Sequence, residues 1–212
     1  MRHVVKLILA SALLAALPQP VADAHFKLIA PESWIVEDQR GDPQKLGPCG
    51  GTAANAGTPS NIVGQAKGGS MLHIKLLETI YHPGHYRVAL AVNSVDELPP
   101  DAVAVERVNE KGLPMSVSAP IQNPVVKPVL ADGLWPHTAK PAAPQTYETD
   151  VELPNINCPK CMLQITQFMA EHGYNKDGGY TYHHCAALQI TADASKPMST
   201  GWPVPMSRTN AQ

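Results

Sequence analysis

The stretch Thr146-Tyr147-Glu148-Thr149-Asp150-Val151-Glu152-Leu153 alternates along its whole length between apolar or β-branched residues and charged ones. Successive side chains of a β-strand point to opposite faces, so this alternation predicts a strand with one face on the core and the other in water. Further stretches of the chain also favour strands. They are His25–Ile29, His73–Ile80, Tyr86–Val92, Cys161–Met169 and Tyr182–Thr191. This number of predicted strands indicates an all-β fold.

The segments between these strands are long and poor in helix signals. Ser33–Pro59 is rich in glycine and proline, and we expect it to form a long irregular loop. Leu98–Lys140 contains seven prolines and little periodicity, which predicts connecting loops with one or two short edge strands. Strands joined by such loops favour an immunoglobulin/fibronectin-like antiparallel β-sandwich.

Residues 1–24 read as a secretory signal peptide. Arg2 and Lys6 make a basic start, Leu7–Leu17 is apolar, and Ala22-Asp23-Ala24 has the small-x-small pattern of a cleavage site. Cleavage after Ala24 would place the protein in the periplasm or outside the cell, with His25 as its first residue. We expect one domain over residues 25–193, and a flexible tail over the small, polar residues 194–212.

Composition excludes several classes of partner. The formal net charge is only −2, which offers no electrostatic basis for binding nucleic acid. No stretch after the signal is long and apolar enough to span a bilayer, so we expect no membrane insertion. Removing the signal leaves 212 − 24 = 188 residues, enough for one well-packed domain, which we expect to be a monomer.

The four cysteines of an exported chain suggest two disulfides. Cys158-Pro159-Lys160-Cys161 is also the spacing of a redox dithiol, but that use normally begins a helix, and strands surround it here. No histidine follows for haem attachment, and no second such pair is present for zinc. A structural Cys158–Cys161 disulfide is therefore favoured. Cys49–Cys185 would then be the second, although four cysteines allow three pairings.

His25 as a first residue would offer a free α-amine together with its imidazole, and the two can chelate one metal ion. The alternative is that histidine follows the cleavage site by chance. His82 and His85 flank Pro83-Gly84 in a predicted turn at the rim of the sandwich, near the expected position of His25.

Three places in the sequence resemble the lytic polysaccharide monooxygenases, copper enzymes that cleave polysaccharides oxidatively. They are the mature N-terminal His25, the turn His82-Pro83-Gly84, and the pair of C-terminal stretches Cys158–Gln164 and Tyr182–Ile190. The resemblance implies one mononuclear copper ion bound by His25 and His82, with Tyr182 in the axial position, and these three as the catalytic residues. It also implies Nδ1 of His25 and Nε2 of His82 as ligands, a polysaccharide substrate and an external electron donor.

Some positions stay open at this point. His85 rivals His82 as second ligand, and we prefer His82 because Gly84 follows it as in the family turn. His85, His183 and Gln167 are candidates for the surroundings of the metal. The fungal cellulose-active enzymes have Gln two residues before the axial tyrosine, whereas this chain has Tyr180.

Three hypotheses about function follow, from different classes. The first is a secreted copper monooxygenase acting on a polysaccharide. The second is a non-catalytic periplasmic copper carrier that uses the same histidines and exchanges copper with a donor or acceptor protein. A third hypothesis is an exported β-sandwich binding module without metal. Paired carboxylates of the kind that hydrolyse glycosides are not evident.

Overall fold

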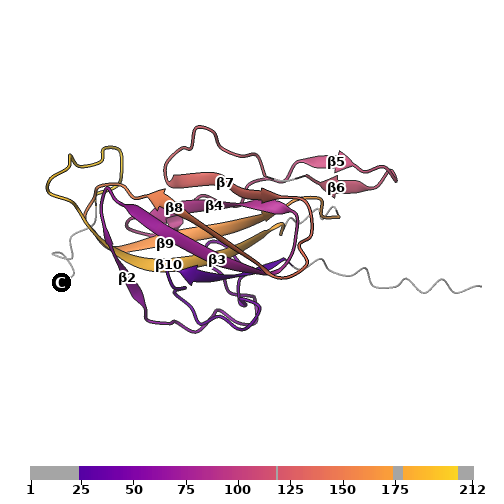
Figure 1. The fold of residues 1–212 in the computed structure, drawn as a ribbon, viewed down its shortest axis with the longest axis horizontal. Helices are drawn as coiled ribbons and strands as arrows, with labels where there is room; N and C mark the ends of the chain where they lie inside the picture. The colour runs from indigo at the N-terminus through magenta and orange to yellow at the C-terminus, as the bar shows by residue number, and fades with distance from the viewer. Residues whose placement is uncertain (1–23, 118, 174–178, 205–212) are drawn as a thin grey trace, which may run out of the picture.

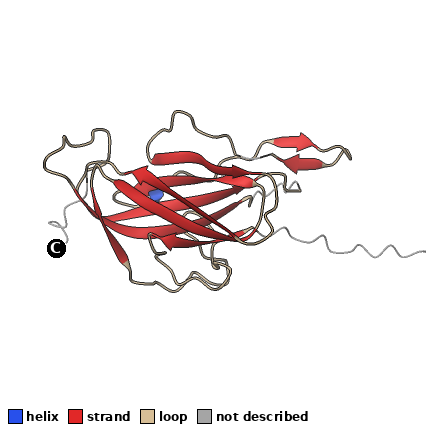
Figure 2. Cartoon of the chain, in the orientation of Figure 1, coloured by secondary structure: helices blue, strands red, loops and turns tan. Residues whose placement is uncertain are grey.

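The computed structural model describes residues 24–117, 119–173 and 179–204, and almost all of its regular structure is β (Figures 1 and 2). Its elements are β1 His25–Ala30, β2 Val63–Lys67, β3 Met71–Ile80, β4 Gly84–Ala91, the short 3-10 helix η1 Val95–Glu97, β5 Glu106–Val108, β6 Pro114–Ser116, β7 Val129–His137, β8 Gln145–Glu152, β9 Cys158–Met169 and β10 Thr181–Thr191. The prediction of an all-β fold is confirmed.

The strands form a sandwich of two sheets. One sheet has the order β1-β3-β8, the other β2-β10-β9-β4-β7, and a separate hairpin pairs β5 with β6. Every pairing is antiparallel except that of β2 with β10, which is parallel. In Figure 1 the β5–β6 hairpin extends beyond one end of the sandwich.

The core lies between the two sheets. Side chains from both sheets enter it, such as Phe26 and Leu76 from one sheet and Val88 and Leu163 from the other. Full burial of such a side chain is worth about 1.5–3 kcal/mol. The opposite face of β4 is covered by loops, where Ala89 and Ala91 pack with Leu98 and the Cys49–Cys185 pair, so the whole strand is buried.

Both disulfides form, and they resolve the open pairing. Cys49 is joined to Cys185 and Cys158 to Cys161. The first attaches the irregular loop after β1 to β10, and the Nε1–H of Trp34 donates to the carbonyl oxygen of Cys49 over 2.8 Å. The expected long loop at 33–59 is thus pinned to the sheet.

Two strands were not predicted. β2 has only the sequence Val-Gly-Gln-Ala-Lys, and among the described residues it pairs with β10 only. β7 has nine residues within the region expected to hold loops and short edge strands, and three register shifts interrupt its pairing with β4.

The two ends of the chain are described only in part. The signal-peptide prediction falls on residues 1–23, outside the described residues, and on Ala24, which is buried. The segment after Ala194 is held in part by Asn155, whose Nδ2 group donates to the carbonyl oxygens of Lys196 and Pro197. Residues 205–212 lie outside the description. In the part of the chain that the structure covers, no helix is long and apolar enough to cross a membrane.

Candidate metal centre

The strand register brings the sequence-predicted histidines to one end of the sandwich. His25, the first residue of β1, pairs with Ile80, the last residue of β3 and two residues before His82. Tyr182 lies at the start of β10, and its ring centroid is 5.1 Å from that of His25. Three segments distant in sequence therefore meet here.

The two ring nitrogens of His25 have different surroundings. Nε2 lies 3.0 Å from Oδ2 of Asp42. Nδ1 is buried and has no hydrogen-bond partner in the described parts of the chain. Buried polar atoms are nearly always satisfied, so an unpaired one needs an explanation such as an absent ion or water. A metal ion at Nδ1 would supply it.

His82 is held through its main chain and its ring. Nδ1 donates to the carbonyl oxygen of Pro83 over 3.0 Å, which leaves the lone pair of the neutral ring on Nε2. Its backbone N–H points to Oε1 of Glu78 at 3.4 Å, and its carbonyl oxygen accepts from Nε2 of His137 at 2.8 Å. Burial lowers the pKa of His82, which favours the neutral, ligating form.

The glycine in the His-Pro-Gly turn has a steric reason. A Cβ on Gly84 would lie 1.8 Å from the carbonyl oxygen of Phe168, so β4 can begin beside β9 here only with glycine. The turn that carries His82 is thereby brought against the sheet.

A buried ion pair supports this turn from behind. Glu78 is 1 % exposed and accepts hydrogen bonds from Nε2 of His137 at 3.1 Å and Nε2 of Gln167 at 2.7 Å. Nδ1 of His137 also faces an acceptor, the carbonyl oxygen of Trp135 at 2.8 Å. Both ring nitrogens of His137 are therefore donors. Although burial opposes it, the hydrogen bond to Glu78 raises the pKa of His137.

Sequence reasoning did not single out His172 or Lys45, and it noted Tyr180 only as a departure from the family pattern. The ring of His172 stacks on His82 with centroids 5.6 Å apart, and Tyr180 meets His172 edge-on at 5.4 Å. Nζ of Lys45 lies 4.4 Å from the ring centroid of Tyr182. No local pattern marks His172 or Lys45, because each meets its partner at the site across a long sequence separation.

The other sequence candidates lie in different surroundings. His85 packs against Phe168 on the face of β4 away from the core, with Nε2 3.7 Å from Oδ1 of Asp132. Nε2 of His183 lies 2.6 Å from Oδ1 of Asp101. Nε2 of Gln167 donates to Glu78, the carboxylate that supports the turn carrying His82.

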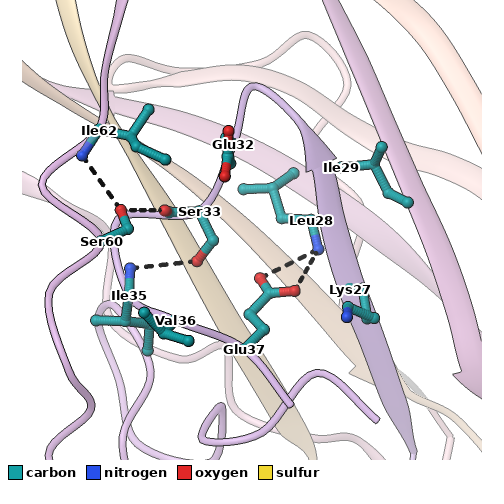
Figure 3. Close-up of a pocket in the computed structure, with 10 residues that line it drawn as sticks. All are labelled: Lys27, Leu28, Ile29, Glu32, Ser33, Ile35, Val36, Glu37, Ser60 and Ile62. Carbon is teal, nitrogen blue, oxygen red and sulfur yellow. Dashed lines mark hydrogen bonds between the residues drawn. The ribbon is translucent and has the colours of Figure 1, made fainter. Parts of the chain in front are cut away.

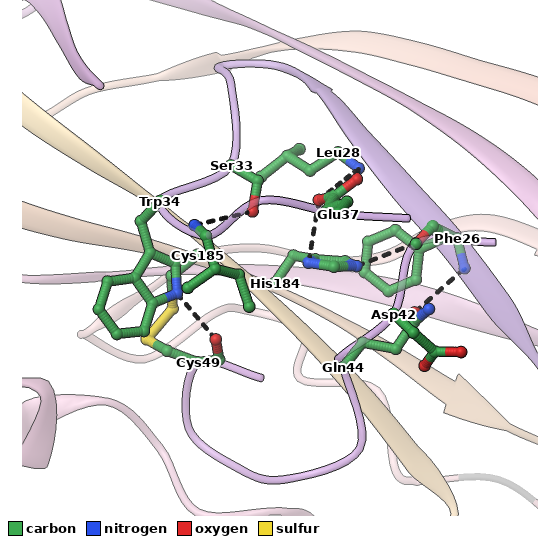
Figure 4. Close-up of polar contacts among 12 residues, drawn as sticks. Phe26, Leu28, Ser33, Trp34, Glu37, Asp42, Gln44, Cys49, His184 and Cys185 are labelled. Atoms are coloured by element: carbon green, nitrogen blue, oxygen red, sulfur yellow. Dashed lines mark hydrogen bonds and ion pairs between the residues drawn. A yellow bond between two sulfur atoms is a disulfide. The ribbon is translucent and has the colours of Figure 1, made fainter. Parts of the chain in front are cut away.

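The loop after β1 caps the open edge of that strand with side chains (Figure 4). The N–H of Phe26 donates to Oε1 of Gln44 at 3.1 Å, and the N–H of Leu28 reaches both oxygens of Glu37 at 3.2 Å. The carbonyl oxygen of Phe26 accepts from Nε2 of His184 at 2.9 Å. These contacts satisfy backbone groups that an edge strand otherwise exposes, and they fix the strand that begins with His25.

A hollow of about 450 Å³ lies farther along the same edge (Figure 3). Five of its ten lining residues are aliphatic and the other five are polar or charged. It is lined by Lys27, Leu28, Ile29, Glu32, Ser33, Ile35, Val36, Glu37, Ser60 and Ile62. Neither His25 nor His82 is among them, so the hollow is separate from the candidate metal centre.

The donor set present suits a metal only if the main chain contributes. Within the described residues, no three His, Cys, Asp or Glu side chains form a group that could hold a metal ion. Two histidines with free ring nitrogens would need a further donor, and the α-amine of a cleaved His25 is the one at hand. Three nitrogen donors suit copper.

Comparisons with known proteins give only a distant structural likeness. No family model matches the chain, and no curated protein matches it. Among solved structures, the chain is similar to the lytic polysaccharide monooxygenase AA15 from Thermobia domestica in the Cu(I) state. The identity is 18%, the TM-score is 0.48, and the match covers 79% of this chain and 99% of that chain. A likeness of this size supports no argument about function.

Proposed function

We propose that this protein is a secreted copper-dependent oxidoreductase, similar to the lytic polysaccharide monooxygenases, that cleaves glycosidic bonds of a polysaccharide. The α-amine and Nδ1 of His25 and Nε2 of His82 would hold one copper ion. One observation carries the proposal: Nδ1 of His25 is buried and unpaired while Nε2 of the same ring is occupied. Such an arrangement leaves one nitrogen for a metal.

The chain's own residues would supply position and shielding. When bound, copper would activate O2 or H2O2 for oxidation of the sugar, with electrons from an external donor. Glu78 and His137 hold the main chain of His82, and the carbonyl oxygen of Pro83 holds its ring proton on Nδ1. Tyr182 packs on His25 and covers one side of its ring.

The metal site is tested first by Cu(II) electron paramagnetic resonance on the mature protein that begins at His25. We expect one equivalent of Cu(II) to give a single nitrogen-coordinated species. His25→Ala and His82→Ala should each lose it. His73→Ala is the matched control, since His73 is an exposed histidine paired with Asp150 over 2.9 Å on the outer side of β3. A wild-type spectrum in either site variant would exclude that residue as a ligand.

Catalysis is tested separately. The copper-loaded protein is incubated with cellulose, chitin and other polysaccharides in the presence of ascorbate, and products are analysed by mass spectrometry. Oxidised oligosaccharides that disappear in His82→Ala support the monooxygenase. A protein that binds copper tightly and yields no oxidised product from any substrate would instead be a copper carrier.

A further inference from the structure

Asp42 approaches His25 from the loop between β1 and β2. Its Oδ2 lies 3.0 Å from Nε2 of His25, and its side chain is 35 % exposed while that of His25 is 7 % exposed. The contact therefore joins a ring inside the molecule to a carboxylate at the surface. The proposed function uses only the opposite nitrogen of this ring.

A tight turn presents Asp42 at this position. Oδ1 of Asp38 accepts hydrogen bonds from three successive backbone N–H groups, those of Arg40 at 2.7 Å, Gly41 at 2.9 Å and Asp42 at 2.9 Å. Although burial opposes them, these bonds lower the pKa of Asp38. The ionised Asp38 thus fixes the backbone from which the Asp42 side chain extends.

The turn also lies directly against β1. Gly41 has a φ of +101°, and a Cβ there would lie 1.9 Å from the carbonyl oxygen of Phe26. Oγ1 of Thr79 lies within hydrogen-bond distance of two carbonyl oxygens, those of Arg40 at 2.6 Å and His25 at 3.1 Å. Two residues after Asp42, Oε1 of Gln44 accepts a hydrogen bond from the N–H of Phe26. Contacts before and after Asp42 therefore set its distance from His25.

We propose that Asp42 is a positioning residue that keeps the ring proton of His25 on Nε2 and so presents the Nδ1 lone pair to the metal. A carboxylate accepts and never donates when ionised, so the nitrogen beside it carries the proton. A histidine that ligates a metal commonly donates its other N–H to a carboxylate, which fixes the tautomer and raises ligand basicity. The orientation of the His25 ring follows from its contact with Asp42, and the role of Asp42 toward copper rests on the proposed function.

The proposal makes two kinds of expectation. In the metal-free mature protein, His25 should be in the Nε2–H tautomer. With copper, the negative charge of Asp42 should strengthen binding of Cu(II) relative to Cu(I). Removal of such an outer partner typically weakens metal binding by about 10–100-fold. The reduction potential of the bound copper should rise when the charge is removed.

The experiment compares Asp42→Ala and Asp42→Asn with the wild type and with Asp150→Asn. Asp150 pairs with the exposed His73 over 2.9 Å and serves as a matched carboxylate–histidine control. Nitrogen-15 NMR of the metal-free proteins reports the tautomer of His25, calorimetry the Cu(II) affinity, and voltammetry the potential. Thermal unfolding checks that each variant is folded.

We expect Asp42→Ala to mix the two tautomers of His25 and to weaken Cu(II) binding by about 10–100-fold. Asp42→Asn keeps an acceptor, so it should retain the tautomer and raise the potential. Asp150→Asn should leave the tautomer of His25, the Cu(II) affinity and the reduction potential unchanged. An unchanged tautomer in Asp42→Ala overturns the proposal. A changed tautomer in a protein that binds no copper supports the orienting role and overturns the proposed function instead.

Discussion

Glu37 and His184 form a buried pair whose charge state is set by their surroundings. Oε1 of Glu37 lies 3.0 Å from Nδ1 of His184 without hydrogen-bond alignment, and Nε2 of His184 donates to the carbonyl oxygen of Phe26. Burial lowers the pKa of His184 to about 3, so the ring is neutral and Nδ1 carries a lone pair. Burial also raises the pKa of Glu37 to about 7. An ionised Glu37 would place a negatively charged oxygen against that lone pair, and protonation of Glu37 removes this repulsion.

This arrangement predicts a pH-dependent stability that one substitution isolates. A carboxyl group whose pKa rises from 4.5 unfolded to about 7 folded stabilises the fold fully below pH 4.5, and this contribution is lost as pH rises through 7. The loss is on the order of 3 kcal/mol. Glu37→Gln resembles the protonated acid at every pH. We expect it to match wild type at pH 5 and to be more stable at pH 8, measured by urea unfolding.

The comparison at each pH removes the trend that His184 contributes to both proteins. A Glu37→Gln protein that is less stable than wild type at pH 8 would show that the carboxylate form is the one the fold requires.

Gly41 and Gly112 separate backbone strain from steric contact. Both have a positive φ, +101° and +75°, but a Cβ on Gly112 meets nothing within 4 Å, whereas one on Gly41 meets Phe26 at 1.9 Å. We expect Gly112→Ala to cost about 1 kcal/mol through strain alone. Gly41→Ala should cost about 2 kcal/mol or more beyond that, because the loop must leave β1. Urea unfolding of both variants measures the difference, and equal losses would contradict the close approach.

At the scale of elements, strands with a clean alternation could be predicted from the sequence and others could not. The stretch Thr146–Leu153 became β8, and the remaining predicted strands appear with bounds shifted by a few residues. β2 has little apolar alternation, and its pairing with β10, which is distant in sequence, is what makes it a strand. β7 contains Gly133 with a φ of +65°, Trp135 with a φ of +46°, and Pro136, and these interrupt the alternation.

The two disulfides differ in the elements they connect, and their contributions should differ accordingly. Cys49 and Cys185 are 136 residues apart, whereas Cys158 and Cys161 are 3 apart, and both pairs are buried. Closing a loop restricts the unfolded chain more when the loop is long, which predicts about 5 kcal/mol for the first and about 2 kcal/mol for the second. Urea unfolding of Cys49→Ala/Cys185→Ala and Cys158→Ala/Cys161→Ala measures both.

Losses of equal size in the two double variants would show that packing of the buried sulfurs, rather than chain entropy, dominates. The short pair thus serves as the control for the long one.

At the scale of the whole molecule, the fold assembles the candidate site from segments that sequence patterns treat separately. The three residues named by resemblance, His25, His82 and Tyr182, lie at one end of the sandwich. Of the residues that support them, Gln167 was named from the resemblance, whereas Asp42, Glu78 and His137 were not, because no local pattern of the sequence marks them. Asp42 reaches His25 through a loop, and Glu78 joins His82 to strands β7 and β9.

The proposed metal centre also depends on where the chain begins. If cleavage after Ala24 creates a ligand, a protein that starts at Ala24 should fold at least as well as one that starts at His25, because Ala24 precedes β1 and its buried side chain only adds contacts to the core. It should nevertheless bind Cu(II) far more weakly, since the α-amine of His25 becomes an amide and the two-nitrogen chelate is lost. The loss should exceed the roughly 10–100-fold typical of losing a ligand's hydrogen-bond partner. Calorimetry with Cu(II) and thermal unfolding on the two proteins test this, and equal copper affinity would exclude the amine from the site.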